Sequence, residues 1–297
     1  MTHRRTAALL LLTPLVVGAL ASCTRTVSSA APASDAVSTE VATTLAATTT
    51  LAPTTTVKAT TTTEAPTTIE GSTTTTLAPN VQIVGGAFIP VAAVGKHSGP
   101  DTQVLQDRLN TLGFWAGNND GKYGFATTQA VMAFQKYLML PATGKVDQAT
   151  ADWLNVFTER GHGRSDNGTL VEIDKQRQLL FIVVDGQTVW TLNTSTGSEK
   201  PYEGPNANDP TKIEKGDAVT PAGLWKVNRE RPDGWLEGDL GKIYRPKYFH
   251  GGIAIHGMTS VPNYPASHGC VRVSVPAMDF IWDNGLVPVG TPVWVHV

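Results

Sequence analysis

Residues 252–275 read GIAIHGMTSVPNYPASHGCVRVSV, two segments with alternating apolar residues that are separated by a loop rich in Pro and Ser. Successive side chains of a strand point to opposite faces, so the valines of the second segment predict a core face. Cys270 and Arg272 are then expected on the opposite, polar face. The first segment ends at His256, which alternation places on the face away from its isoleucines. We expect two neighbouring strands whose ends bring an imidazole close to a thiol.

The surrounding sequence, residues 168–297, has the pattern of a mainly β domain. Residues 169–197 predict two strands joined by a turn at Asp185 and Gly186, because Asp-Gly between apolar strands is a strong hairpin signal. Further strands are expected over 224–230, 252–257, 270–275 and 291–297. One helix is expected over 275–285, with a proline near its start and a glycine at its end. We expect a curved sheet or a β-sandwich.

Residues 97–157 have a helical period instead, with apolar residues three and four positions apart. Helices are expected over 101–114, 127–140 and 147–157. The first should begin at an N-cap on Asp101 or Thr102, and the third should place Trp153 on one side together with Thr150, Leu154 and Phe157. Three short helices predict a small all-α domain of the kind that binds ligands, joined to the β domain by a polar linker over 158–168.

The N-terminal segment has the features of an export signal. Two arginines precede an apolar run over residues 7–20, which is shorter than the about 20 residues that span a bilayer. Residues 1–22 are therefore expected to be a signal peptide. The sequence LASC, which ends at Cys23, resembles the lipobox of bacterial lipoproteins. This resemblance implies lipidation of Cys23 and a membrane anchor without a transmembrane helix. An ordinary signal peptide with a nearby cysteine is the alternative.

The next segment, residues 23–80, consists mostly of Thr, Ala, Pro and Ser, and no aromatic residue precedes Phe88. Such a segment cannot bury enough apolar surface to offset its loss of conformational entropy, so we expect a disordered stalk. Residues 81–96 are apolar and Gly-rich, and they fit either a lead-in strand or a packing arm. The net charge of −2 gives no electrostatic reason to expect nucleic-acid binding.

Cys270 is one of only two cysteines, and four roles are open to it. It can form a disulfide with Cys23, but lipidation or signal removal would leave it unpaired. It can bind zinc together with His250, His256 and His268, although the paired spacings typical of zinc sites are absent. It can be a small structural residue. It can be a nucleophile, which we favour because an unpaired thiol in an oxidising compartment usually has a use.

A nucleophilic role would use the neighbouring residues in defined ways. The imidazole of His256 can take the proton of the Cys270 thiol to give a thiolate–imidazolium pair. Gly269 lets the backbone come close to a substrate, so that nearby amide groups can face a developing oxyanion. Arg272 is always charged and can orient a carboxylate or the loop. His250 is expected to be structural.

Two parts of the chain resemble known families. Residues 100–156 contain, in order, LQ, LG, DG-x-Y-G, AV-x2-FQ and TG, a pattern similar to the peptidoglycan-binding domain of bacterial cell-wall enzymes. The turn residues Asn118, Asp120 and Tyr123 are candidate ligand contacts there. In the β domain, His-Gly at 256–257 followed by SHGCVR resembles the signature of the L,D-transpeptidase (YkuD-like) catalytic domain.

The second resemblance implies a set of site residues. Cys270 would attack the carbonyl between the third and fourth residues of a peptidoglycan stem tetrapeptide. His256 would be the general base, oriented by the carbonyl of Gly257. Backbone amides of His268, Gly269 and Cys270 would form the oxyanion hole, and the His268 side chain is either catalytic or structural. Substrate contacts are expected from Ser267, Gly257, Arg272, Tyr248 and Tyr264. The two tyrosines can equally pack the loop.

The same resemblance implies an activity and its setting. Loss of the terminal D-alanine would leave a thioester, which the side-chain amine of a second stem would resolve as a 3→3 cross-link. Water in place of the amine would make an L,D-carboxypeptidase, and a decayed domain would leave a non-catalytic wall-binding lipoprotein. Carbapenems would inactivate the cysteine. Donor and acceptor stem peptides are the implied partners, with no cofactor and no metal. The expected place of action is the cell wall, from a lipid anchor on the outer face of the membrane.

Overall fold

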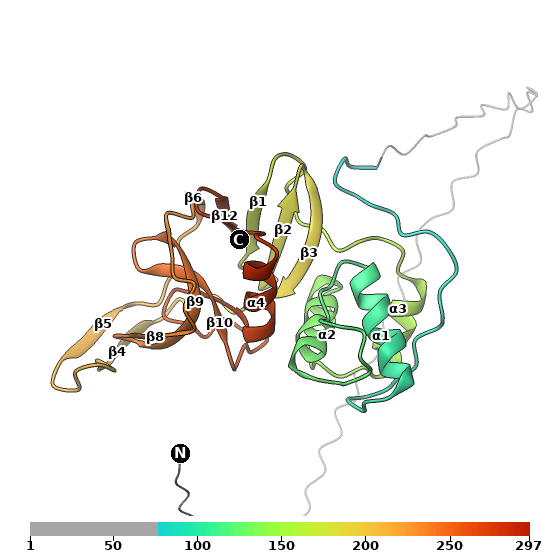
Figure 1. Cartoon of the computed structure of the whole chain (residues 1–297), viewed down its shortest axis with the longest axis horizontal. Helices are drawn as coiled ribbons and strands as arrows, with labels where there is room; N and C mark the ends of the chain where they lie inside the picture. Colours follow the sequence, from blue (N-terminus) through green and yellow to red (C-terminus); the bar gives the residue numbers. More distant parts are fainter. Residues whose placement is uncertain (1–76) are drawn as a thin grey trace, which may run out of the picture. The chain divides into compact units, whose positions relative to one another are not determined.

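The computed structural model describes residues 77–297. The predicted signal peptide over 1–22, the lipidation of Cys23 and the stalk up to residue 76 lie outside the described residues. Within residues 77–297, no helix combines the length and the apolar character that crossing a membrane requires. This part of the chain contains a helical region followed by a mainly β region, which confirms the predicted order of helices before a mainly β domain (Figure 1).

The helical region contains three helices, α1 (Pro100–Thr111), α2 (Phe125–Tyr137) and α3 (Gln148–Val156). Their apolar positions meet in one core, in which Leu105 on α1, Phe134 on α2 and Leu154 on α3 are fully buried. The helical period of the sequence therefore identified the faces that pack together.

Two details of these helices differ from the prediction. The N-cap of α1 is Gly99 rather than Asp101 or Thr102, because Pro100 takes the first helical position, where its missing N–H is tolerated. Trp153 on α3 was expected on the same side as Leu154, but Trp153 is 44% exposed whereas Leu154 is fully buried. A short helix at the surface turns only one face inward, and Trp153 lies outside that face.

Residues 77–98 form an arm that packs on the helical region. Isolated β-bridges join this arm to residues that flank α3 on either side. Asn80 is buried, and its side-chain amide donates hydrogen bonds to the carbonyls of Gly163 and Ser165 at 3.0 and 3.1 Å. Asn80, which the sequence assigned to the stalk, therefore belongs to this arm. Of the two interpretations of segment 81–96, the structure supports a packing arm and not a lead-in strand.

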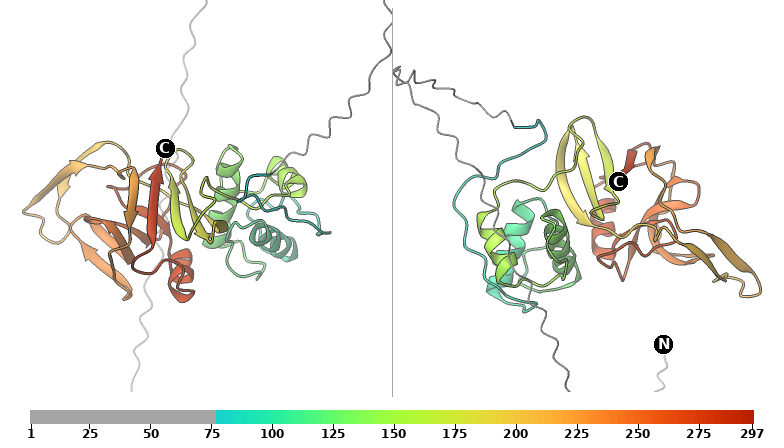
Figure 2. Two further views of the ribbon diagram at one scale, coloured as in Figure 1. Left: turned by 90° about the horizontal axis from the view of Figure 1, so that it is seen from above. Right: turned by 180° about the vertical axis from the view of Figure 1, so that it is seen from behind.

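The β region contains the remaining elements of the described chain. They are β1 (Leu170–Asp174), β2 (Leu179–Val184), β3 (Gln187–Asn193), β4 (Pro201–Pro205), β5 (Ile213–Asp217), β6 (Gly223–Lys226), β7 (Arg229–Glu230), β8 (Trp235–Gly238), β9 (Gly241–His250), β10 (Ile253–Met258), β11 (Val271–Ser274), α4 (Val275–Asp283) and β12 (Pro292–His296). One sheet has the order β3-β2-β1-β12-β6, and a second has the order β11-β10-β9-β7 with β8 paired to β9. Figure 2 shows the β region from two further sides. The β4–β5 hairpin forms a small sheet of its own.

The stretch over 169–197 contains three strands where the sequence predicted two. The predicted turn at Asp185 and Gly186 joins β2 to β3, and both residues have positive φ, as a two-residue hairpin turn requires. A second turn separates β1 from β2. Asp174 makes it by accepting hydrogen bonds from the backbone and side chain of Arg177 at 2.8 and 2.7 Å. This side-chain turn carries no Gly or Pro, so the sequence did not reveal it.

The predicted core face of β11 is confirmed. Val271 and Val273 are fully buried in the core that the two large sheets share with α4. Val275, which was expected to continue this face, is instead the first residue of α4. Ser274 ends the strand because its Oγ accepts a hydrogen bond from the Ala277 N–H at 3.2 Å and caps the helix.

Strand β2 contributes side chains to two cores. Leu180 and Ile182 belong to the core between the large sheets, whereas Leu179, Phe181 and Val183 belong to the core of the helical region. This division follows from the alternation of a strand, which places successive side chains on opposite faces. The helices therefore pack directly on the β region through β2.

Candidate active site

A cavity of about 510 Å³ contains the side chains that the sequence singled out. Cys270, Arg272 and His268 line it from the SHGCVR stretch, and His256 lines it from β10. Its other walls come from the β4–β5 hairpin, from β7 and β9, and from the connection between β8 and β9. The predicted thiol and the predicted imidazole thus reach the same cavity.

The parallel pairing of β10 and β11 sets the positions of these groups. In this pairing His256 lies opposite Arg272. Cys270 immediately precedes β11 and is two residues before Arg272, so alternation puts both side chains on the face away from the buried valines. This arrangement agrees with the polar face expected from the sequence.

His256 is held as a neutral base. Its side chain is buried, and its Nδ1 lies 3.0 Å from the carbonyl oxygen of Gly257. Because a carbonyl only accepts, Nδ1 carries the proton and Nε2 has a free lone pair. Burial lowers the pKa of His256 to about 4, although the hydrogen bond to Gly257 opposes this shift, and the charge of Arg272 lowers the pKa further.

Cys270 is held as a neutral thiol. Its Sγ lies 3.8 Å from the carbonyl oxygen of Gly252, to which the S–H donates. Burial raises the pKa of the Cys270 thiol, while the backbone N–H of Ala254 and the charge of Arg272 lower it. The resting pair is therefore a thiol and a neutral imidazole. The ion pair expected from the sequence would form only when a substrate draws the proton to His256.

The turn before the cysteine is braced by Ser267. Its Oγ donates to the Cys270 carbonyl at 2.5 Å and accepts from the Gly269 N–H at 3.0 Å. The Gly269 amide, which the family resemblance implied as one of three oxyanion-hole donors, is therefore already engaged by Ser267. The amides of His268 and Cys270 make no hydrogen bond within residues 77–297, so these two remain as donors. Gly269 has a φ of 130°, which glycine adopts without strain.

The remaining predicted residues divide between the cavity and its support. Tyr248 lines the cavity, as does His268, whose ring packs 4.7 Å from the ring of Tyr202. Gly257 does not line it and acts through its carbonyl on His256. Tyr264 is 60% exposed and does not line the cavity. The backbone carbonyl of Tyr264 accepts a hydrogen bond from the Ser195 hydroxyl, and this bond holds the loop in place.

The alternative roles of Cys270 find little support in the described chain. Cys270 has no disulfide partner among residues 77–297, and Cys23 lies outside them. His250 packs on Trp225, with ring centroids 4.1 Å apart, and does not line the cavity. No group of three or more His, Cys, Asp or Glu side chains in this part of the chain is placed to hold a metal ion. The zinc interpretation therefore lacks its ligand set there.

Several cavity residues were not identified from the sequence. Tyr202 and Asp217 come from the β4–β5 hairpin, Asp239 comes from the β8–β9 connection, and Arg229 comes from β7. The guanidinium of Arg229 lies 3.9 Å from the ring centroid of Tyr248. These residues belong to short polar segments, and no motif signalled that the fold would bring them to the thiol.

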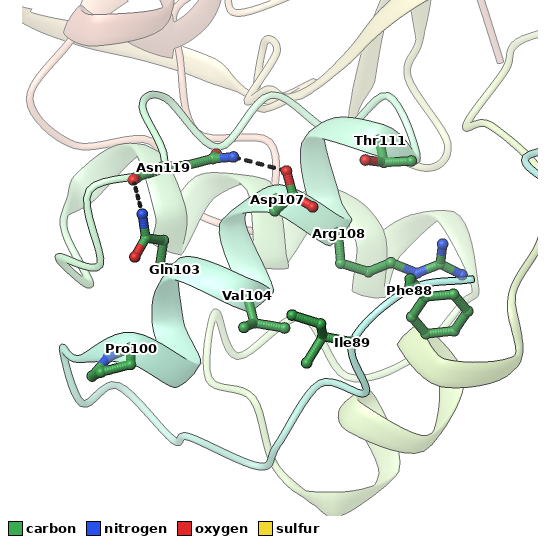
Figure 3. A pocket seen from close by; sticks show the side chains of 9 residues that line it. All are labelled: Phe88, Ile89, Pro100, Gln103, Val104, Asp107, Arg108, Thr111 and Asn119. Atoms are coloured by element: carbon green, nitrogen blue, oxygen red, sulfur yellow. Dashed lines mark hydrogen bonds between the residues drawn. The ribbon is translucent and has the colours of Figure 1, made fainter. Parts of the chain in front are cut away.

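The helical region has a separate cavity of about 390 Å³ between α1 and the arm (Figure 3). Phe88 and Ile89 of the arm line it, and the guanidinium carbon of Arg108 lies 3.7 Å from the ring centroid of Phe88. Of the predicted ligand contacts, Asn118 and Asp120 line a different depression of about 330 Å³. Tyr123 instead donates its hydroxyl to the carbonyl of Gly144 at 3.0 Å, which is a structural role.

Comparison with known proteins identifies both regions. The L,D-transpeptidase catalytic domain family matches residues 168–295, and a peptidoglycan binding domain family matches residues 98–154. A search of curated proteins finds no match.

Solved structures give the same result. An L,D-transpeptidase from Xylanimonas cellulosilytica is 41% identical, with a TM-score of 0.61, over 71% of this chain and 100% of that chain. An L,D-transpeptidase from Stackebrandtia nassauensis is 20% identical, with a TM-score of 0.37, over 71% of this chain and 98% of that chain. The TM-score and the identity of this second structure are too low to support a conclusion about this chain. The match to the first structure, which holds residues 123–326 of that protein and is covered along its whole solved chain, shows that this chain belongs to the L,D-transpeptidase family, with a peptidoglycan-binding domain ahead of its catalytic domain.

Proposed function

We propose that this protein is a cysteine-dependent transpeptidase that forms 3→3 cross-links in peptidoglycan. The observation that supports this most is the shared cavity of Cys270 and His256. There the imidazole of His256 has its Nδ1 proton held by the carbonyl of Gly257, which leaves Nε2 as the basic atom, and His256 lines the same cavity as the thiol. This pairing is what a cysteine nucleophile activated by a general base requires.

In the first half of the reaction, the donor stem acylates the enzyme. Nε2 of His256 takes the thiol proton while Sγ of Cys270 attacks the carbonyl of the third stem residue. The negative charge on the carbonyl oxygen is stabilised by the amides of His268 and Cys270. When the tetrahedral intermediate collapses, the bond to the terminal D-alanine breaks. The departing amine takes the proton from His256, which leaves a thioester.

In the second half, an acceptor stem resolves the thioester. Its side-chain amine attacks the thioester carbonyl, and Nε2 of His256 takes a proton from that amine. The C–S bond then breaks, the proton returns to sulfur, and a new amide joins the third residues of the two stems. Because the pKa of His256 is lowered to about 4, the imidazole returns to its neutral form after each transfer at neutral pH.

The cavity supplies charge of both signs around these reacting groups. Arg272 and Arg229 line it together with Asp217 and Asp239. Stem peptides carry carboxylates and an amine, so both kinds of group find a counter-charge in this cavity. Arg272 also favours the thiolate, because its charge lowers the pKa of Cys270.

We further propose that the enzyme acts from a lipid anchor at Cys23. The support is the lipobox-like LASC sequence behind an apolar segment. Replacement of Cys23 with Ala should release the protein from the membrane fraction of a bacterial host into the soluble fraction. Membrane retention equal to that of the wild type would argue against lipidation.

The activity is tested by the masses of the products formed from a disaccharide tetrapeptide. A dimer whose mass is that of two substrates minus one alanine supports the transpeptidase. A tripeptide product without dimer indicates an L,D-carboxypeptidase instead. If neither the dimer nor the tripeptide forms, with the wild type as with Cys270→Ala, the result indicates a non-catalytic wall-binding protein.

A further inference from the structure

The segment over residues 193–198, which begins at the end of β3, holds the SHGCVR stretch at both ends. Ser195 and Arg272 exchange backbone hydrogen bonds at 3.0 and 3.2 Å. The carbonyl of Thr196 accepts a hydrogen bond from the Ser267 N–H at 3.0 Å. The position of the cysteine between these two attachments therefore depends on the position of segment 193–198.

Lys136 of α2 holds this segment from the other side. Its Nζ donates to the carbonyls of Gln178 and Thr194, each at 3.1 Å. The hydroxyl of Thr194 in turn donates to the carbonyl of Arg272 at 2.7 Å. Lys136 is 7% exposed and forms no salt bridge within residues 77–297, and burial lowers its pKa to about 7. Burial of an amine without a carboxylate partner costs free energy, and the hydrogen bonds to the two carbonyls offset that cost.

Gln129, two helical turns before Lys136, holds the loop between His256 and Cys270. Its Nε2 donates to the carbonyl of Val261 at 3.2 Å, and its Oε1 accepts from Nδ2 of Asn193 at 2.6 Å. Gln129 is 7% exposed and Val261 is 3% exposed, so this contact is shielded from water. One amide side chain of α2 thus fastens segment 193–198 and the loop to each other.

We propose that Gln129 and Lys136 are positioning residues for the nucleophile, through which the helical domain holds the Cys270 turn in its reactive geometry. Neither residue lines the cavity, so neither touches the reacting atoms. A displacement of about 1 Å at a reacting group can lower a rate by about 100-fold. The helical domain is then part of the catalytic unit in addition to any role in wall binding. The kinetic part of this inference rests on Cys270 being the nucleophile, as proposed above.

The test compares Gln129→Met and Lys136→Met with Gln135→Met as a matched control. Gln135 is also a buried amide on the same helix, but its Nε2 donates to the Lys145 carbonyl and to the Thr150 hydroxyl at 2.9 and 3.1 Å, within the helical domain. All three changes remove buried hydrogen bonds, whereas only the first two remove bonds to segment 193–198 or the loop.

The kinetic readout is acylation of Cys270 by a stem tetrapeptide, below the unfolding temperature of each full-length variant. Gln129→Met and Lys136→Met should lower the rate at saturating donor by about tenfold or more, with donor KM nearly unchanged. Alkylation by iodoacetamide, which needs no oxyanion hole, should remain close to the wild-type rate. Gln135→Met should acylate like the wild type. Equal acylation losses in all three variants, or no loss in the first two, would overturn the proposal.

A second readout requires no substrate and therefore separates this inference from the proposed function. Amide hydrogen exchange should quicken over residues 193–198 and 261–272 in Gln129→Met and Lys136→Met. In Gln135→Met it should quicken only within the helical domain. If wild-type protein is not acylated, the proposed function fails while this readout still tests the positioning. Unchanged exchange over 261–272 in the first two variants would overturn the positioning itself.

Discussion

At the scale of single residues, one backbone carbonyl decides how His256 acts. The Gly257 oxygen accepts the Nδ1 proton, which leaves Nε2 as the basic atom. Burial then lowers the pKa of His256 to about 4 and raises that of Cys270. Both groups are therefore neutral at rest, and in the proposed mechanism the proton moves only when the thiol attacks.

Replacement of His256 with Gln should lower Cys270 acylation by about 10²–10⁴-fold, the usual contribution of a general base. In the wild type, kcat/KM for acylation should rise with pH through about 4, because only neutral His256 accepts the thiol proton. The measurement is a pH profile of acylation at low donor concentration. An acidic limb near the ordinary histidine value of 6.5 would show that His256 is more exposed than the structure has it.

The same shift predicts the sign of a stability change. Between pH 4 and 6.5 the unfolded chain protonates His256 while the folded chain does not. The free energy of unfolding should therefore rise with pH across this window and fall on acidification. His256→Gln should flatten this part of the profile in urea unfolding.

Replacement of Ser267 with Ala should destabilise the protein by about 1–3 kcal/mol, because the Cys270 carbonyl and the Gly269 N–H would lose a buried partner. Acylation should fall as well, since the turn that carries the thiol would loosen. Urea unfolding and acylation kinetics check both effects, with the exposed Ser260→Ala as the control. A Ser267→Ala variant as stable and as active as this control would show that the brace is dispensable.

At the scale of elements, the backbone at Gly197 lies tightly against the segment that directly follows β5 of the β4–β5 hairpin. A Cβ added at Gly197 would lie 2.1 Å from the Ala218 carbonyl oxygen. Gly204 in β4, by contrast, has nothing within 4 Å of an added Cβ. The backbone contact at Gly197 therefore fixes how the hairpin enters the cavity wall.

Gly197→Ala should accordingly lower the free energy of unfolding by about 1–3 kcal/mol or more, because the backbone must move to admit the methyl group. Gly204→Ala should stay within about 0.5 kcal/mol of the wild type. Denaturant unfolding of the two variants measures the difference. Equal stabilities would mean that segment 193–198 and residue 218 are not packed as closely as the structure has them.

Elements with a clean apolar period were predictable, and those built on polar contacts were not. The three helices, the Asp185-Gly186 hairpin and the core face of β11 follow from periodicity and turn chemistry. The turn made by the Asp174 side chain and the exposed β4–β5 hairpin have neither signal. The cavity residues that these elements carry, such as Tyr202 and Asp217, were missed for that reason.

At the scale of the whole described chain, β2 joins two cores that the sequence assigned to separate domains. Alternate side chains of this one strand enter the helical core and the core of the sheets. The linker over 158–168 looked like a domain boundary because it is polar. Contacts such as those of Gln129 and Lys136 were not predictable, since they join positions far apart in the sequence through buried polar groups.

This shared packing predicts that the helical and β regions unfold in one cooperative transition. Far-UV circular dichroism, which follows the helices, and tryptophan fluorescence, which also reports the β region, should give coincident urea curves. A helical signal lost well before the fluorescence change would instead show two independent domains.

The central claim, that Cys270 is the acylated nucleophile, is tested most directly by intact-protein mass spectrometry after exposure to a stem tetrapeptide. The wild type should gain the mass of the donor minus its terminal alanine, and peptide mapping should place the adduct on Cys270. Cys270→Ala should show no adduct under the same conditions. An adduct that persists in Cys270→Ala, or a wild-type protein that makes cross-linked product with its thiol free to alkylation throughout, would contradict the account.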